Sequence, residues 1–298
     1  MEHNSYFNIA GFDICLAGKD TDASHIELLP SFKAFMTEGV EHKPFVTMTI
    51  DDTLFPTKDC SLIRDFDTGN GKTRVCRLHG GGYQYIIRDI EGRDCCLLKT
   101  NSDFSQCACA LNGTWAMRNF GLNNALMMAF AYSTSQAETL LIHASCVIHD
   151  GQAYPFIAQS GTGKSTHSDL WMRCHPGTEL LNDDNPIIRI IGGKPYVYGS
   201  PWSGKTPCYR NMRAPLGAMT RIERAGTNSI ERLEPVRAFA SMLPACSSMK
   251  WDSAIYNNAC NTITRIIETV PVFTMHCLPD EDAAILCHDT ITRQTPSR

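Results

Sequence analysis

Residues 158–166 read AQSGTGKST, and their setting decides the fold. The run follows QAYPFIA (152–158), an apolar stretch typical of a strand, and leads into KSTHSDLWMRC (164–174), which favours a helix. A strand, a glycine-rich turn and a helix in this order form a phosphate-binding loop, because backbone N–H groups and the helix N-terminus converge on phosphate oxygens. Pro155 lacks a donor and predicts edge or irregular pairing for the strand. The order predicts an α/β fold with a nucleotide site.

A second glycine–lysine run, GSPWSGKT (199–206), fits the phosphate-loop formula G-x-x-x-x-G-K-[ST], whereas Ala158 breaks that formula in the first run. Context still favours the first run, because the first formula position lies furthest from the phosphates. In the second run Pro201 removes a donor and Trp202 is bulky for a backbone cradle. Pro207 follows the run directly, and Pro215 closes the segment before a stable helix can form. We predict that the first run, and not the second, holds a nucleotide.

Two adjacent acids, Asp183 and Asp184, follow the next apolar stretch, one helix and one strand after Lys164. In a nucleotide loop Lys164 would reach the β- and γ-phosphates, and the Ser165 hydroxyl would bind Mg²⁺. One of the two carboxylates would hold the metal, and the other would act as base for an attacking hydroxyl. The alternative is that Asp-Asp-Asn-Pro is only a turn.

Four further residues carry charge or proton chemistry near these motifs. His143 interrupts the apolar run LLIHASCVI (140–148), where it is either a core residue or a group presented to the γ-phosphate. Lys205, Arg210 and Arg213 gather around the second loop. They predict a phosphate clamp on the acceptor side, because guanidinium forks and ammonium groups suit phosphoryl oxygens, with a solvated basic loop as the alternative.

The first part of the chain differs from the rest in its residue pattern. Short runs rich in β-branched and aromatic residues, separated by turn signals, fill the residues before about 120. We therefore predict a β-rich domain of residues 1–120 and a nucleotide-binding domain of residues 121–298. The predicted strand regions are 7–17, 44–50, 73–98, 104–111, 140–148, 152–158, 178–182, 185–199, 214–224 and 271–278. The predicted helices are 24–35 (kinked at Pro30), 121–138, 164–174, 234–243, 254–268 and 280–292.

Composition limits the partners. A net charge of −4 over 298 residues gives no reason to expect nucleic acid or a membrane surface, and no apolar run approaches the ~18 residues of a membrane span. The amino terminus shows no basic stretch before a long apolar one, so we expect a cytoplasmic protein. Its 14 cysteines then read as reduced, buried thiols, since the paired C-x-x-C spacing of zinc sites is missing. The oligomeric state stays open, a homo-oligomer included.

Four motifs in this order, LIHAS (141–145), AQSGTGKST, LLNDDNPI (180–187) and SPWSGK (200–205), resemble the HPr kinase/phosphorylase family of P-loop kinases. They are closest to its diverged members, whose core is shared with phosphoenolpyruvate carboxykinase. The resemblance covers roughly residues 121–290. It implies an α/β P-loop kinase core of this type beside the β-rich domain. The family's E-[ILV]-R-G-[ILV]-G signature is absent, so the acceptor stays open.

The resemblance also implies roles for individual residues. One aspartate of the pair would be the catalytic base and the other would lie near the metal, Ser165 would assist Mg²⁺, and His143 would lie near the transferred phosphoryl group. The residues that would bind ATP phosphates are Ser160, Gly161, Thr162, Gly163, Lys164, Ser165 and Thr166.

Together these features predict a kinase that uses ATP and Mg²⁺. It would transfer the γ-phosphate to a hydroxyl acceptor, with serine in a protein, a peptide or free form as the leading candidate. Lys164 and Lys205 would neutralise phosphate charge during the transfer. The alternatives are a phosphotransferase like phosphoenolpyruvate carboxykinase and a non-catalytic regulator that senses ATP.

Overall fold

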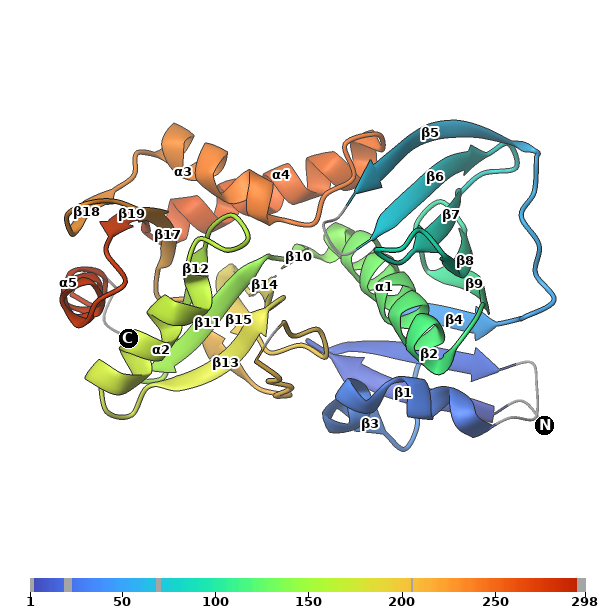
Figure 1. Ribbon diagram of the computed structural model, residues 1–298, viewed down its shortest axis with the longest axis horizontal. Helices are drawn as coiled ribbons and strands as arrows, with labels where there is room; N and C mark the ends of the chain where they lie inside the picture. Colours follow the sequence, from blue (N-terminus) through green and yellow to red (C-terminus); the bar gives the residue numbers. More distant parts are fainter. Residues whose placement is uncertain (1–2, 19–22, 68–70, 205, 294–298) are drawn as a thin grey trace. The chain divides into compact units, whose positions relative to one another are not determined.

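The computed structural model describes residues 3–18, 23–67, 71–204 and 206–293 (Figure 1). The chain forms two compact units, Met1–Thr134 and Ser135–Arg298. The division falls after Thr134 rather than near residue 120, because the helix that ends there packs on the sheet of the first unit. None of the described helices combines the length and the apolar character that a membrane crossing needs.

The first unit is built on a mixed sheet that has nine strands within the described residues, in the order β3-β1-β2-β4-β9-β8-β7-β6-β5. The pairs β2–β4 and β4–β9 are parallel and the others antiparallel. The strands are β1 His3–Ile9, β2 Phe12–Gly18, β3 Met36–Thr37, β4 Val46–Ile50, β5 Cys60–Asp67, β6 Lys72–Leu78, β7 Tyr83–Arg88, β8 Asp94–Thr100 and β9 Gln106–Leu111. The helices are η1 Ala23–Leu28, η2 Pro30–Phe35 and α1 Trp115–Thr134.

Helix α1 belongs to this first unit. It packs against β8 and β9, and the contact is close at Gly121. A Cβ atom at Gly121 would lie 2.7 Å from the Cβ atom of Cys96 and 2.9 Å from the carbonyl oxygen of Cys95. Only glycine allows the helix to approach the strand this closely.

The second unit contains two sheets within the described residues, ordered β13-β11-β12-β17-β19-β18 and β10-β14-β15-β16. The strands are β10 Thr139–Leu141, β11 Ala144–His149, β12 Gln152–Ile157, β13 Glu179–Asp184, β14 Ile187–Ile191, β15 Lys194–Tyr198, β16 Arg213–Pro215, β17 Met219–Arg224, β18 Ser229–Arg232 and β19 Val272–Cys277. The helices are η3 Ser135–Ala137, α2 Lys164–Cys174, α3 Pro235–Met242, η4 Leu243–Ala245, α4 Ser253–Thr269 and α5 Glu281–Ile291. Several sheets with helices make this a mixed α/β protein.

Helices cover both faces of the six-stranded sheet. On one face Ile157 and Met219 pack with α3 and α4 around Met242 and Ile263. On the other face Phe156 and its neighbours pack against α2 and α5. Successive side chains of β12 and β17 point to opposite faces of the sheet, as in any strand, and therefore lie in two separate cores.

Five of the six strands bring residues of interest to one edge of this sheet. Strands β12, β17 and β19 are parallel, so their carboxyl ends share that edge. Strand β11 runs antiparallel to β12 and begins there, and β13 runs antiparallel to β11 and ends there. The edge thus carries, in spatial order, Asp183 and Asp184, His143, the loop 158–163, Arg224 and Cys277.

Most predicted elements are confirmed, and the differences have local causes. The run 7–17 is a hairpin, because Ala10 and Gly11 adopt positive φ angles of 53° and 80°. Pro30 splits the predicted helix 24–35 into two short 3₁₀ helices. Pro155 does not mark an edge strand: β12 is interior, but its ladder with β17 begins only at Phe156.

Candidate active site

The loop between β12 and α2 presents free backbone donors. Gly161 and Gly163 have φ angles of 77° and 126°, a region that favours glycine. A Cβ atom added at either glycine would meet no atom within 4 Å, so the space beside them is open. The N–H groups of Gly163, Lys164 and Ser165 have no hydrogen-bond partner among the described residues. Such unpaired groups at a helix start are suited to anions.

Arg224, at the end of β17, holds the carbonyl side of this loop. Its Nε donates to the carbonyl oxygen of Thr162 at 3.0 Å, and a terminal nitrogen donates to the carbonyl oxygen of Gly161. With these carbonyls engaged, the loop keeps its N–H groups for a ligand. No sequence motif contains Arg224; the one signal in the sequence is that Arg224 ends the predicted strand 214–224.

Three predicted residues form a connected chain. Nζ of Lys164 lies 2.8 Å from Nε2 of His143 and 3.3 Å from the carbonyl oxygen of Ala158. Nδ1 of His143 lies 3.0 Å from Oδ1 of Asp184. If the ammonium of Lys164 donates to Nε2, the imidazole proton is on Nδ1 and donates to Asp184; these proton positions are assigned from the geometry.

Burial and charge act on both ends of this chain. Burial lowers the pKa of Lys164, and the carboxylates of Asp184 and Asp183 oppose that shift. For Asp184 burial works to raise the pKa, but the hydrogen bond from His143 and the charge of Lys164 outweigh it, so the pKa is lowered. Asp184 is therefore an ionised carboxylate at neutral pH.

Ser165 and Asp183 form a second pair beside the first. The hydroxyl of Ser165 donates to both carboxylate oxygens of Asp183, at 2.9 Å and 3.1 Å. Asp183 is 3% exposed, whereas Ser165 is exposed at the helix start. A hydroxyl and a carboxylate beside a phosphate cradle are hard oxygen donors of the kind that Mg²⁺ takes.

The backbone at the acidic pair is strained. Asp184 has a φ angle of 124°, which costs on the order of 1–3 kcal/mol for a residue other than glycine. An isolated bridge to Ser203 holds the strand end in this conformation, and Ser203 Oγ donates to the Asp183 carbonyl at 3.0 Å. Strain that neighbouring structure maintains is frequent at functional sites.

The second loop, GSPWSGKT, supports the acidic pair. The buried side chain of Asn182 donates to the carbonyl oxygens of Ser200, Trp202 and Cys208, each at 3.3 Å. Trp202 itself is buried. The loop is thus fastened to β13 by its carbonyls, and its largest side chain is packed inside the protein. Lys205, predicted to neutralise phosphate charge, lies outside the described residues.

Arg210 and Arg213 have partners elsewhere. Arg210 donates to Glu179 at 2.6 Å, the residue that begins β13, whereas the acidic pair ends it. A strand of six residues spans about 17 Å. Arg213 lies in the other sheet, donates to the hydroxyl of Tyr198 at 2.8 Å and stacks over Tyr196. The structure does not bring these two guanidinium groups to the loop between β12 and α2, where the phosphates were predicted to bind.

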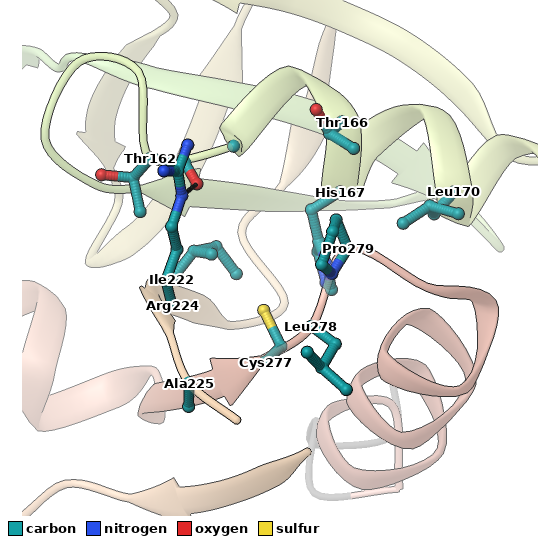
Figure 2. A pocket seen from close by; sticks show the side chains of 11 residues that line it. Thr162, Thr166, His167, Leu170, Ile222, Arg224, Ala225, Cys277, Leu278 and Pro279 are labelled. Carbon is teal, nitrogen blue, oxygen red and sulfur yellow. Dashed lines mark hydrogen bonds between the residues drawn. The ribbon is translucent and has the colours of Figure 1, made fainter. Parts of the chain in front are cut away.

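An apolar pocket of about 370 Å³ opens beside the loop on the α2 face (Figure 2). Its walls include Thr162, Leu170 and Ile222, with Leu278 from the segment after β19. His167 also lines it, is 3% exposed, and its Nε2 has no hydrogen-bond partner among the described residues. His167 lies one helical turn after Lys164 and belongs to none of the predicted site residues.

Two further cavities continue this pocket along the edge. One of about 370 Å³ shares Thr162, Ile222 and Arg224 with it. The other, of about 220 Å³, shares Gln159 and Arg221 with the second cavity and reaches His143. The three form a trough that is apolar at one end, basic over the loop and polar at the other.

A magnesium–nucleotide complex fits the donors at this edge. No group of three His, Cys, Asp or Glu side chains in the described part of the chain is arranged to hold a metal by itself. Mg²⁺ with a nucleotide needs only one or two carboxylates, because phosphate oxygens and water complete its octahedron. The Ser165–Asp183 pair beside free loop N–H groups meets that requirement.

Comparison with known proteins gives little beyond this geometry. No protein-family model and no curated protein matches the chain. Among solved structures, the Hpr(Ser) kinase/phosphatase from Coxiella burnetii is similar over 52% of this chain and 94% of its own, at 11% identity and a TM-score of 0.30. At this level of similarity, the function must be argued from the site.

Proposed function

We propose that the protein is a kinase that transfers the γ-phosphate of ATP, with Mg²⁺, to a hydroxyl group. The observation that carries this proposal is the convergence of Lys164, Ser165, His143 and both aspartates at one sheet edge. Free N–H donors, a lysine, a carboxylate–hydroxyl pair and a second, hydrogen-bonded carboxylate are the parts that phosphoryl transfer needs.

The trough suggests how the nucleotide would lie. The base would occupy the apolar pocket, where His167 offers an unpartnered ring nitrogen to a heteroatom of the base. The phosphates would cross the N–H groups of the loop, which Arg224 holds in place. The γ-phosphate would then reach Lys164, on the side of His143 and the acids.

The two acids would have different tasks. Asp183, together with Ser165, would hold Mg²⁺, which supplies charge neutralisation at the phosphates. Asp184 would take the proton of the acceptor hydroxyl, with His143 orienting its carboxylate. The hydroxyl oxygen forms a new bond to the γ-phosphorus, the bond to the β-phosphate oxygen breaks, and ADP leaves. Lys164 neutralises charge on the transferred group.

The test combines calorimetric Mg·ATP binding with ADP release during turnover on a panel of hydroxyl acceptors. Asp184→Asn should keep ATP affinity within about threefold and lower turnover by about 10²–10⁴-fold, as loss of a general base does. Asp183→Asn should weaken binding of Mg·ATP while binding of metal-free ATP changes little. Asp169→Asn, an exposed acid on α2, is the control. ATP binding without ADP release on any acceptor would refute the kinase and favour an ATP sensor.

A further inference from the structure

The cavity at the polar end of the trough lies on the face of the sheet opposite α2. It has a volume of about 220 Å³, and its walls include Gln159, Arg221, Ser241 and Pro244. Arg221 alternates with Ile222 along β17, and its neighbours Ile157 and Met219 face α3 and α4. The cavity is therefore separated from the apolar pocket by the sheet and joined to it over the loop.

This cavity adjoins the lysine of the loop. His143 and Ala158 line it, and both bond Nζ of Lys164, through Nε2 at 2.8 Å and the carbonyl oxygen at 3.3 Å. A molecule in the cavity would thus meet a γ-phosphate held by Lys164. The proposed base, Asp184, is one hydrogen bond away through His143.

Two polar groups at the cavity have unused hydrogen-bonding capacity. Nε of Arg221 lies 2.8 Å from Oε1 of Glu223 in an ion pair, and no hydrogen bond joins its two terminal nitrogens to the described residues. The Ser241 hydroxyl, 7% exposed, also has none within the described chain. A buried hydroxyl without a partner is unfavourable, and a polar ligand would remove that cost. A free guanidinium edge fits a carboxylate.

The cavity wall is preformed. The backbone N–H of His143 donates to the carbonyl oxygen of Ala245 at 2.7 Å, and Ile142 bridges Cys246 next to it. These bonds fasten the end of the α3–η4 segment to the start of β11. The volume of the cavity is below the roughly 300–1,000 Å³ of pockets for drug-sized ligands. The cavity therefore admits one small group.

We propose that this cavity is the acceptor site and that it selects a group of about the size of serine that carries a hydroxyl and a carboxylate together. The hydroxyl would face Nε2 of His143, which would take its proton while the Nδ1 proton of His143 passes to Asp184, and the carboxylate would pair with Arg221. Free serine and the last residue of a peptide both present this chemistry. The inference rests on the proposed phosphoryl transfer and adds the substrate class to it.

The test compares L-serine with L-serinamide, which differs only in lacking the carboxylate. With Mg·ATP, kcat/KM should be at least tenfold higher for L-serine, and Arg221→Gln should reduce that ratio to about one while Kd for Mg·ATP stays within threefold. Arg221→Lys, which keeps the charge without the fork, should give an intermediate ratio. Arg232→Gln, an exposed arginine on β18, is the matched control. Circular dichroism checks that each variant folds.

Two peptide arms identify the source of the carboxylate. One peptide ends in serine with a free carboxylate, and the other is the same peptide amidated at its carboxyl terminus. Phosphoryl transfer to the first and not to the second also supports the site. Equal transfer to serine and serinamide, or transfer only to internal serines, overturns it. A direct titration of L-serine into protein with Mg·ADP separates this inference from the function. Serine binding that Arg221→Gln weakens at least tenfold, in a protein without turnover, would refute the kinase and keep the site.

Discussion

Lys164 illustrates how one side chain links the loop to the acids. A lysine that is 8% exposed needs partners for its ammonium, and here a ring nitrogen of His143 and one carbonyl oxygen lie within hydrogen-bond distance. Neither of these atoms belongs to an anion, so a phosphate oxygen that enters the loop offers Lys164 a stronger, charge-assisted bond. These two contacts hold the Lys164 side chain in place, and neither hinders the binding of a phosphate group.

His143 should matter for turnover more than for binding. His143→Gln keeps a polar side chain but breaks the connection between Lys164 and Asp184. We expect kcat to fall by about 10–100-fold and Kd for Mg·ATP to change by less than threefold, since the loop N–H groups remain. Stopped-flow ADP release and calorimetry measure the two. An unchanged kcat would contradict the role given to His143.

Arg224 should matter for binding. Arg224→Gln removes the bonds that hold the carbonyls of Gly161 and Thr162, so the loop must be ordered by the ligand itself. We expect Kd for Mg·ATP to rise by about tenfold, with kcat at saturation within threefold. The matched control is Arg237→Gln, an exposed arginine paired with Glu231. A rise of the same size in the control would show a general charge effect.

At this scale the sequence predicted the residues that belong to local motifs. Lys164, Ser165 and both aspartates could be identified because strand, loop, helix and strand follow one another without interruption. Arg224 comes from a strand about 60 residues further on, and only the parallel pairing of β12 with β17 brings it to the loop. Single-sequence patterns contain no such pairing.

Helix α2 connects the loop to the core of the second unit. His167 packs edge-on against Phe156, with ring centroids 4.7 Å apart. At the other end of the helix His175 stacks on His288 of α5, with centroids 3.7 Å apart. Burial, and then the neighbouring His288, lower the pKa of His175. Protonation of His167 or of His175 therefore opposes the packing of α2.

The stability of the second unit should therefore depend on pH. Burial lowers the pKa of His167 from its ordinary 6.5 to about 4. Between these values the unfolded chain binds a proton that the native chain does not. The free energy of unfolding therefore has its full value above pH 6.5. Protonation of His167 in the unfolded chain lowers it by about 3 kcal/mol as the pH falls to 4.

Urea unfolding, followed by tryptophan fluorescence from pH 4.5 to 7.5, measures this dependence. His167→Gln should reduce the pH slope of the unfolding free energy, whereas the exposed His79→Gln should leave it unchanged. Equal slopes in the wild type and His167→Gln would show that His167 does not contribute.

Helices and strands could be predicted where a long hydrophobic pattern ends at clear turn or breaker residues. The predicted helix 164–174 coincides with α2, and α4 and α5 differ from their predicted ranges by one residue at each end. The edge strands β5 and β18 were not predicted. Both are largely exposed and polar, so their pairing, rather than their own pattern, makes them strands.

At the scale of the whole chain, each unit has its own core. Two apolar clusters, one on each face of the six-stranded sheet, lie within residues 135–298. Each proposed nucleotide contact also lies in this range. The predicted domain boundary near residue 120 differs from the division after Thr134, because α1 is apolar on the side that faces β8 and β9.

Residues 135–298 expressed alone should therefore fold and bind Mg·ATP. We expect a cooperative thermal transition and a Kd within about threefold of the full chain. Residues 121–298, which carry most of α1 without its sheet, should aggregate more readily, because the apolar face of that helix is exposed. Loss of ATP binding in residues 135–298 would show that the first unit contributes to the site.

The most direct test asks which glycine–lysine loop holds the triphosphate. Calorimetric Kd values for Mg·ATP are compared between Lys164→Ala and Lys205→Ala, each in the full chain and each checked for folding. We expect affinity to fall by about 10–100-fold for Lys164→Ala and to change by less than threefold for Lys205→Ala. The reverse order, with affinity lost at Lys205 and kept at Lys164, would contradict this prediction.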